Sequence, residues 1–151
     1  AYAYKTLGYK KAAVLTDVVS DYAVGLSNFF KKSYKKLGGE LVADMKYSSG
    51  DQDFTAQLTE LISKKPDIVF MPAYFAEGAI IMKQARELGA TFVLMGGDAM
   101  DNPDTVKIAG KAAEGLPGKC IYDLEFHVLI LLPDRQAFCD AAALPVSWPC
   151  L

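Results

Sequence analysis

The chain has few of the residues that build metal and nucleophilic centres. Its 151 residues include one histidine, His127, and three cysteines, Cys120, Cys139 and Cys150. The cysteines form no CxxC pair and have no metal-type spacing to the histidine, and their odd number argues against a closed disulfide framework. We therefore expect no bound metal and no cofactor, and we interpret the thiols as buried or incidental.

A strong excess of one charge and a long apolar run are also absent. The formal net charge is -2, so no basic surface field is available to hold nucleic acid. The apolar run at residues 128–132 is far too short to cross a bilayer, which predicts no membrane span. Residues 1–11 alternate aromatic and basic side chains without an apolar centre, so no signal peptide is visible in this sequence.

Motifs for nucleotide binding and hydrolysis are missing as well. No GxGxxG follows the first predicted strand, and no GxSxG is present. Gly118-Lys119 resembles the end of a phosphate loop, but Cys120 replaces the required serine or threonine. We therefore predict that the chain is not an enzyme. A catalytic alternative would use Asp17 or Asp98 with a nucleotide or flavin on a flavodoxin-like sheet, and the missing phosphate loop argues against it.

What the sequence does contain is a regular alternation of strand-type and helix-type segments. Apolar runs at residues 12–16, 41–47, 67–71 and 92–95 predict four strands. Apolar residues at three- and four-residue spacing predict helices from Ser20 or Asp21 to Gly38, from Asp53 to about Pro66, from Glu77 to Leu88 and from Pro103 to about Gly110. This order predicts an α/β fold, with an open parallel sheet and helices on both of its faces.

The character of the sequence changes near residue 118. We predict an α/β ligand-binding lobe over residues 1–118 and an atypical C-terminal segment over residues 119–151. Residues 120–132 are apolar enough for one long strand or two. Beyond Pro133 a short helix-like piece is followed by two prolines and the sole tryptophan, Trp148, and no clean element is predicted there.

Polar and aromatic side chains follow three of the predicted strands. Tyr22 comes after the first strand, Tyr74 after the third and Asp98 after the fourth. Ligands of open α/β sheets bind outside the carboxyl ends of the strands, so these three residues are candidates for a binding site. Two phenols and one carboxylate suit a small amphipathic ligand that carries an ammonium group.

Each of these residues also has a purely structural interpretation. Asp98 follows Gly96-Gly97, which permit a sharp turn and the close approach of a ligand, but aspartate also favours turns and helix caps. The tyrosines are equally suited to packing at a strand–helix junction. Glu77 at the start of a helix is explained by the helix dipole alone.

Four stretches of the sequence are distinctive: LGYKKAAVLTD, SDYAVGLSNFFKKSYKKLGGE, GDQDFTAQLTELISKKPDIVFMPAYFAEGAIIMKQARELG and GGDAMDNPDTVKIAGKAAEG. They resemble the type I periplasmic binding proteins, in particular the branched-chain amino-acid class that serves ABC importers. The resemblance extends from residue 1 to about residue 115 and corresponds to most of the second of two flavodoxin-like lobes. Such proteins are periplasmic, or extracellular and lipid-anchored, and deliver their ligand to an ABC permease.

The resemblance also implies roles for individual residues. It implies that Tyr22 lines the cleft, that Tyr74 contacts the ligand and that Asp98 holds the α-ammonium group of an amino acid. The groups that hold the ligand carboxylate would come from the first lobe, which the resemblance does not cover. The leading prediction is thus non-covalent amino-acid binding by a lobe whose site is incomplete alone. The alternative is a structural domain that self-associates, for example as a homodimer, through its former cleft surface.

Overall fold

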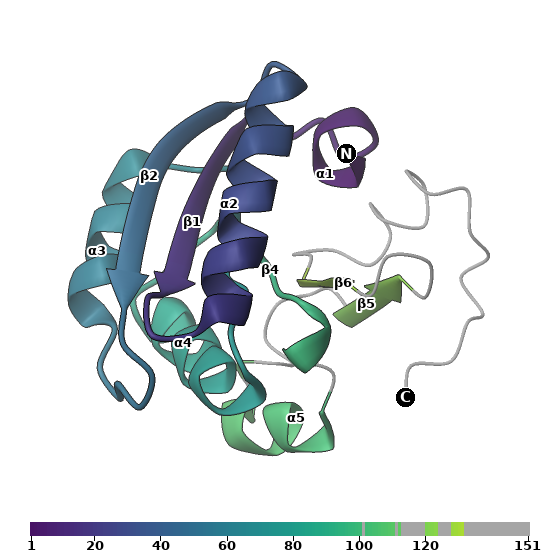
Figure 1. The fold of residues 1–151 in the computed structure, drawn as a ribbon. Coiled ribbons are helices and arrows are strands. Elements are labelled where there is room, and N and C mark those ends of the chain that lie inside the picture. Colours follow the sequence, from purple (N-terminus) through teal and green to yellow (C-terminus); the bar gives the residue numbers. More distant parts are fainter. Residues whose placement is uncertain (101, 111, 113–119, 124–127, 132–151) are drawn as a thin grey trace, which may run out of the picture.

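The computed structural model describes residues 1–100, 102–110, 112, 120–123 and 128–131 (Figure 1). Its helices and strands follow one another in chain order as α1 Tyr2–Lys5, β1 Lys11–Asp17, α2 Asp21–Lys36, β2 Glu40–Tyr47, α3 Thr55–Lys64, β3 Ile68–Phe70, α4 Phe75–Glu87, β4 Val93–Met95, the 3-10 helix η1 Asp98–Met100, α5 Pro103–Ala109, β5 Cys120–Asp123 and β6 Val128–Leu131. The predicted βαβαβαβα order is therefore confirmed.

The sheet has the strand order β2-β1-β3-β4-β6-β5. Strands β2, β1, β3 and β4 pair in parallel, as the sequence predicts. The chain passes from β1 to β2 on one side and then crosses to β3 on the other side of β1. The order of the strands therefore reverses between β1 and β3. In sheets of this kind the crevice at such a reversal is the usual place for a ligand. Tyr22 follows β1 and Tyr74 follows β3, so two of the three candidate residues flank this point.

Strands β5 and β6 extend the sheet with the opposite polarity. β6 is antiparallel to β4, with Leu94 opposite Leu131, and β5 is antiparallel to β6. The segment predicted as one strand or two is thus two strands, and the complete sheet is mixed rather than purely parallel. Pairing between β4 and β6 joins residues far apart in the sequence, so the local pattern carried no information about its direction.

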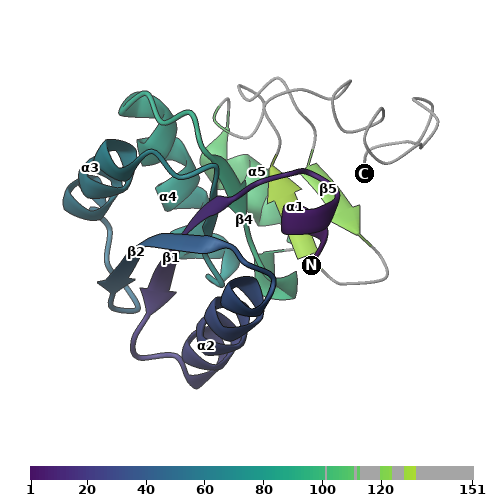
Figure 2. The same cartoon turned by 90° about the horizontal axis from the view of Figure 1, so that it is seen from above.

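Two helical layers cover the parallel part of the sheet, with α2 on one face and α3 and α4 on the other (Figure 2). The side chains of each strand alternate between these layers, as extended backbone requires. Ala13, Leu15, Val69 and Leu94 pack with Leu58, Leu61, Ile81 and Met82 of α3 and α4. Ala12, Val14, Ile68, Phe70, Val93 and Met95 pack with Leu26, Phe30 and Tyr34 of α2. This double burial explains why the strands are continuous apolar runs.

Helix boundaries follow from local capping. Ser20 is extended and its hydroxyl accepts a hydrogen bond from the Ala23 N–H at 3.3 Å, so α2 begins where the sequence predicts. The sequence predicts the next helix from Asp53, but α3 begins at Thr55, with Phe54 at the cap position, and the Asp53 carboxylate accepts from the Thr55 N–H at 2.9 Å. Helix α4 starts at Phe75, two residues before the predicted Glu77, because Tyr74 is the last residue with extended backbone.

Candidate ligand-binding site

The carboxyl ends of the parallel strands, marked by the arrowheads of β1 and β2 in Figure 1, bring the three candidate residues together. The hydroxyl of Tyr22, in the first turn of α2, donates a hydrogen bond of 2.5 Å to Oδ1 of Asp98, in η1. The two residues are separated by 76 positions in the sequence. Topology alone therefore assembles the tyrosine and the carboxylate at one edge.

Tyr74 completes an aromatic pair beside this hydrogen bond. Its ring centroid lies 5.7 Å from that of Tyr22, with the two planes inclined by 30°. Separations of about 4.5–7 Å are those at which aromatic rings attract one another. Tyr74 is 47% exposed, so its ring also faces solvent, where a ligand would arrive. The predicted proximity of Tyr22, Tyr74 and Asp98 is thus observed, while their role in binding stays a prediction.

Gly97 determines how closely Tyr22 approaches Asp98. A Cβ atom at this position would lie 2.5 Å from the Tyr22 hydroxyl oxygen and 3.6 Å from its Cζ. The sequence predicts that this glycine admits a ligand, whereas in the structure the space is taken by the hydroxyl of Tyr22. Gly97 is therefore required by the hydrogen bond that orients the Asp98 carboxylate.

Met100 anchors the short helix that carries Asp98. Its side chain is buried, and it fills notches left by two glycines, Gly96 after β4 and Gly78 in α4. A Cβ atom at Gly78 would lie 2.6 Å from Met100 Cε, and one at Gly96 would overlap its sulfur. Neither this residue nor the helix η1 that contains it was predicted, because a three-residue 3-10 helix has no apolar periodicity in the sequence.

Electrostatics keep the Tyr22 phenol protonated. Burial, the hydrogen bond to Asp98 and the nearby negative charge raise the pKa of Tyr22 to about 12, and the Ala99 N–H partly opposes this increase. At neutral pH the phenol is therefore a neutral donor. Asp98 is exposed, and the described hydrogen bond to it uses only Oδ1, so its second carboxylate oxygen can accept a hydrogen bond from a cationic group.

The remaining carboxylates of this edge hold loops together. Asp17 is buried, and its carboxylate accepts from the Val19 N–H at 3.0 Å and from the hydroxyl of Ser49. Glu77 accepts from the Gly50 N–H at 3.2 Å. These bonds tie the loop after β2 to β1 and to α4. They give Asp17 a structural role, whereas the sequence had left a phosphate or nucleotide contact open.

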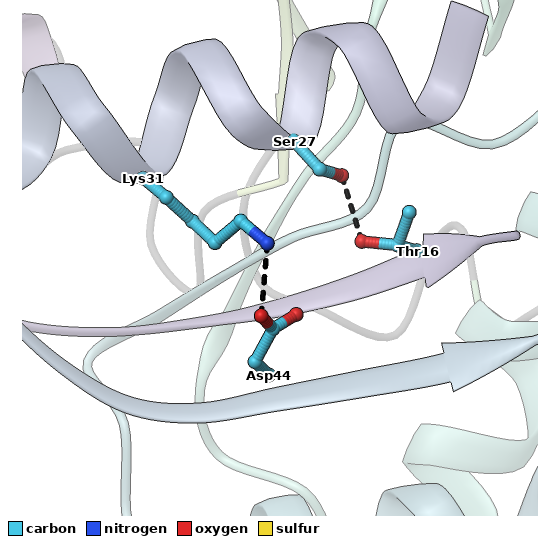
Figure 3. A network of polar contacts seen from close by, with 4 residues as sticks. All are labelled: Thr16, Ser27, Lys31 and Asp44. Atoms are coloured by element: carbon cyan, nitrogen blue, oxygen red, sulfur yellow. Dashed lines mark hydrogen bonds and ion pairs between the residues drawn. The ribbon is translucent and has the colours of Figure 1, made fainter. Parts of the chain in front are cut away.

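Polar contacts beneath α2 hold this helix, and with it Tyr22, over the sheet (Figure 3). The buried Thr16 and Ser27 hydroxyls are 2.8 Å apart, and Lys31 Nζ lies 2.8 Å from Asp44 of β2. The ion pair is partly exposed and contributes little, about 0–1 kcal/mol. The buried hydroxyl pair is the more specific contact, because either group without the other would be left unsatisfied.

Apolar side chains border the site. Val18 and Val19, directly after β1, are 45% and 66% exposed, and they lie in the loop that leads to Tyr22. Neither valine was predicted as a site residue, since a valine that follows a strand carries no sequence signal of exposure. With Tyr74 they form the apolar part of the edge, and Asp98 forms its anionic part. This combination suits a small aliphatic ammonium compound.

Within the ranges that the structure describes, no group of three or more histidine, cysteine or acidic residues is placed to hold a metal ion. In the same ranges no helix combines the length and the apolar character that a transmembrane helix needs.

Comparison with known proteins extends these observations. The periplasmic binding protein family matches residues 1–118. Among curated proteins, a Leu/Ile/Val-binding protein homologue of Brucella melitensis is 32% identical over 117 residues, covering 76% of this chain and 31% of the relative. The Leu/Ile/Val-binding protein BraC3 of Rhizobium johnstonii is 32% identical over 142 residues, covering 94% of this chain and 37% of the relative.

Solved structures give the same result. A leucine-binding protein of Thermotoga maritima superposes with a TM-score of 0.71 and 46% identity, covering 74% of this chain and 32% of that protein. A second structure is that of LivJ of Streptococcus pneumoniae, a branched-chain amino-acid transporter substrate-binding protein solved with isoleucine. It superposes with a TM-score of 0.68 and 38% identity, covering 72% of this chain and 30% of that protein. The chain therefore spans about a third of the length of these relatives.

Proposed function

Since the chain belongs to the periplasmic binding protein family, we propose that it binds branched-chain amino acids non-covalently as one lobe of a solute-binding protein. The arrangement of Tyr22, Tyr74 and Asp98 at the carboxyl edge is the observation that carries this proposal. Asp98 would accept hydrogen bonds from the ligand ammonium group, and the two tyrosines would form the wall beside it. No chemical step is proposed, so the chain would act as a binding module and not as an enzyme.

The proposed setting is that of the relatives. We infer a location in the periplasm or on the outer face of the cell, and delivery of the ligand to an ABC permease, as the names of similar proteins suggest. Both inferences concern the whole protein, of which this chain spans about a third of the relatives' length.

The isolated chain should bind weakly. A complete site of micromolar affinity corresponds to about −8 kcal/mol. Charge-assisted hydrogen bonds contribute about 1.5–3 kcal/mol each, and among the described residues no hydrogen bond or ion pair places a cationic group beside Tyr22, Tyr74 and Asp98 for the carboxylate of an amino acid. Removing two such bonds leaves a dissociation constant in the millimolar range.

A thermal-shift comparison tests the proposal. Leucine, isoleucine and valine at several times their dissociation constants should raise the melting temperature by a few degrees. Asp98→Ala should abolish the shift, whereas Glu60→Gln, which removes an exposed charge on α3, should preserve it. Equal shifts in the wild type and Asp98→Ala would place the ligand elsewhere and refute the proposed site.

A second candidate function is self-association. Val18, Val19 and Tyr74 are exposed in loops of the carboxyl edge, and Phe29 is 71% exposed on α2. Burying such side chains against a second copy would stabilise a homodimer. Sedimentation velocity over a wide concentration range tests it: dimers that dissociate in Val19→Lys support the idea, and a strict monomer contradicts it.

A further inference from the structure

We propose that the carboxyl edge of this chain prefers a cationic amine without a carboxylate over a zwitterionic amino acid, so that leucinamide binds more tightly than leucine. The inference rests on the proposed function, because it takes Asp98 as the group that receives the ammonium. It goes further by assigning a ligand class to the described edge itself.

The charges of the edge are mostly negative. Carboxylates come from the end of β1, the first residue of α2, the first turn of α4 and η1, as Asp17, Asp21, Glu77 and Asp98. At the other end of the sheet, basic residues lie at the start of β1 and at the ends of α2, α3 and α4, as Lys10, Lys11, Lys35, Lys36, Lys64 and Arg86. A ligand at Asp98 therefore approaches an acidic surface.

Two described cations, Lys46 and Lys107, lie towards the carboxyl edge. Lys46 occupies the penultimate position of β2, at the edge of the sheet, and is exposed. Three strand spacings of about 4.8 Å separate β2 from β4, which Asp98 follows, and at the resulting distance of about 14 Å two unit charges in water interact by only about 0.3 kcal/mol. Lys107, in α5, lies 2.6 Å from Asp104, so this pair carries no net charge. Neither cation therefore contributes much at the site.

Helix dipoles oppose this field only in part. The amino termini of α2 and α4 point to the same edge, and each carries a positive partial charge of about half a unit. Each is accompanied by a full negative charge in its first turn, Asp21 in α2 and Glu77 in α4. The balance at both helix starts is therefore negative.

Hydrogen bonding does not reverse the preference. The donor closest to Asp98, the Tyr22 hydroxyl, already points at Oδ1 of that carboxylate. A ligand carboxylate would have to take this hydroxyl from Asp98, which would leave Asp98 with one partner fewer. An ammonium group instead adds to the existing contact through the second oxygen, so the ammonium end of the ligand gains and the carboxylate end loses.

The size of the effect follows from the Coulomb interaction. A ligand carboxylate several ångströms from Asp98, in largely aqueous surroundings, should weaken binding about three- to tenfold at low salt. The preference should shrink towards unity at about 0.5 M salt, where the Debye length falls below about 5 Å.

The test is a set of amide NMR titrations of the full chain with leucinamide, leucine, 3-methylbutylamine and 3-methylbutanoate. At about pH 6.5 the amines are protonated. We expect leucinamide and 3-methylbutylamine to perturb the amides around Tyr22, Tyr74 and Asp98 with dissociation constants about three- to tenfold below that of leucine at low salt. We expect no perturbation by 3-methylbutanoate.

A matched pair of variants isolates the field. Asp21→Asn removes a charge from the edge, and Glu60→Gln removes one from the exposed flank of α3. Asp21→Asn should reduce the ratio of leucine to leucinamide dissociation constants about twofold, and Glu60→Gln should leave it unchanged. If both variants reduced the ratio of dissociation constants equally, the preference would not arise from the charges of the carboxyl edge, and the proposal would be wrong.

The two proposals fail in different ways. Binding of leucine as tightly as leucinamide, or more tightly, would overturn the amine preference and leave the proposed function intact. Absence of any perturbation near Asp98 by every amine, at tens of millimolar and low salt, would refute the ligand site itself.

Discussion

Asp67 and Asp98 show how the two edges of this sheet use the same side chain differently. At the amino edge, Oδ2 of Asp67 accepts the N–H groups of Lys10 and Lys11 at 2.8 Å each, which fixes the start of β1 beside β3. At the carboxyl edge, Asp98 receives one side-chain hydrogen bond, from Tyr22, and is otherwise exposed. One carboxylate is committed to the fold, and the other is oriented by the fold and open to a ligand.

The largest expected effect concerns stability at the amino edge. Asp67→Ala leaves two backbone N–H groups without their charged acceptor and should lower the free energy of unfolding by about 1.5–3 kcal/mol. Asp98→Ala should cost less than about 1 kcal/mol, because a single partly exposed bond is lost. Urea denaturation of both variants measures the difference, and equal losses would remove the distinction between the two edges.

A smaller effect is expected at Gly97. In Gly97→Ala the new Cβ, 2.5 Å from the Tyr22 oxygen, should force the phenol away from Asp98 and cost about 1 kcal/mol. In the Tyr22→Phe background the same substitution should be nearly neutral, because the nearest remaining ring atom, Cζ, is 3.6 Å away.

Gly25→Ala serves as the control for Gly97→Ala. Gly25 is exposed in α2 and a Cβ there meets nothing within 4 Å, so alanine should stabilise the helix by about 0.5–1 kcal/mol. Urea denaturation of the three variants and of the double variant measures the coupling. A cost of Gly97→Ala that persists in the Tyr22→Phe background would contradict the assigned role of Gly97.

Both edges also share a loss of stability in alkali. Burial raises the pKa of Tyr22 and of Tyr34 to about 12, with Asp98 adding to the first and Asp67 to the second. Because the unfolded value is about 10, this stabilisation is complete below about pH 10 and is lost as the pH rises through about 12.

Phenylalanine variants separate the two contributions to this alkaline loss. Tyr22→Phe and Tyr34→Phe should each flatten the decline of the unfolding free energy above about pH 10. Asp98→Asn should flatten only the part of this decline that is due to Tyr22. An alkaline slope unchanged in Tyr22→Phe would mean that its phenol titrates normally in the folded chain.

The sequence predicted the parallel core because each strand is an uninterrupted apolar run and each helix has an apolar stripe. It also predicted the grouping of Tyr22, Tyr74 and Asp98, because parallel strands end at one edge. It did not predict the Tyr22–Asp98 bond, since nothing local links residues 76 positions apart. The helices α1 and η1 were missed because they are short and are held by tertiary contacts. Residues 120–132 were predicted as one strand or two, but the antiparallel pairing of β6 with β4 was not predicted, because it joins residues far apart in the sequence.

The most direct test of the central claim is carbon-detected NMR of the aspartate carboxyl groups during a titration with 3-methylbutylamine. The Asp98 carboxyl resonance should move with a millimolar midpoint, while the Asp67 resonance stays in place because both N–H groups that occupy it belong to the fold. Equal movement of the two, or movement of neither, would contradict the assignment of the carboxyl edge as the ammonium site.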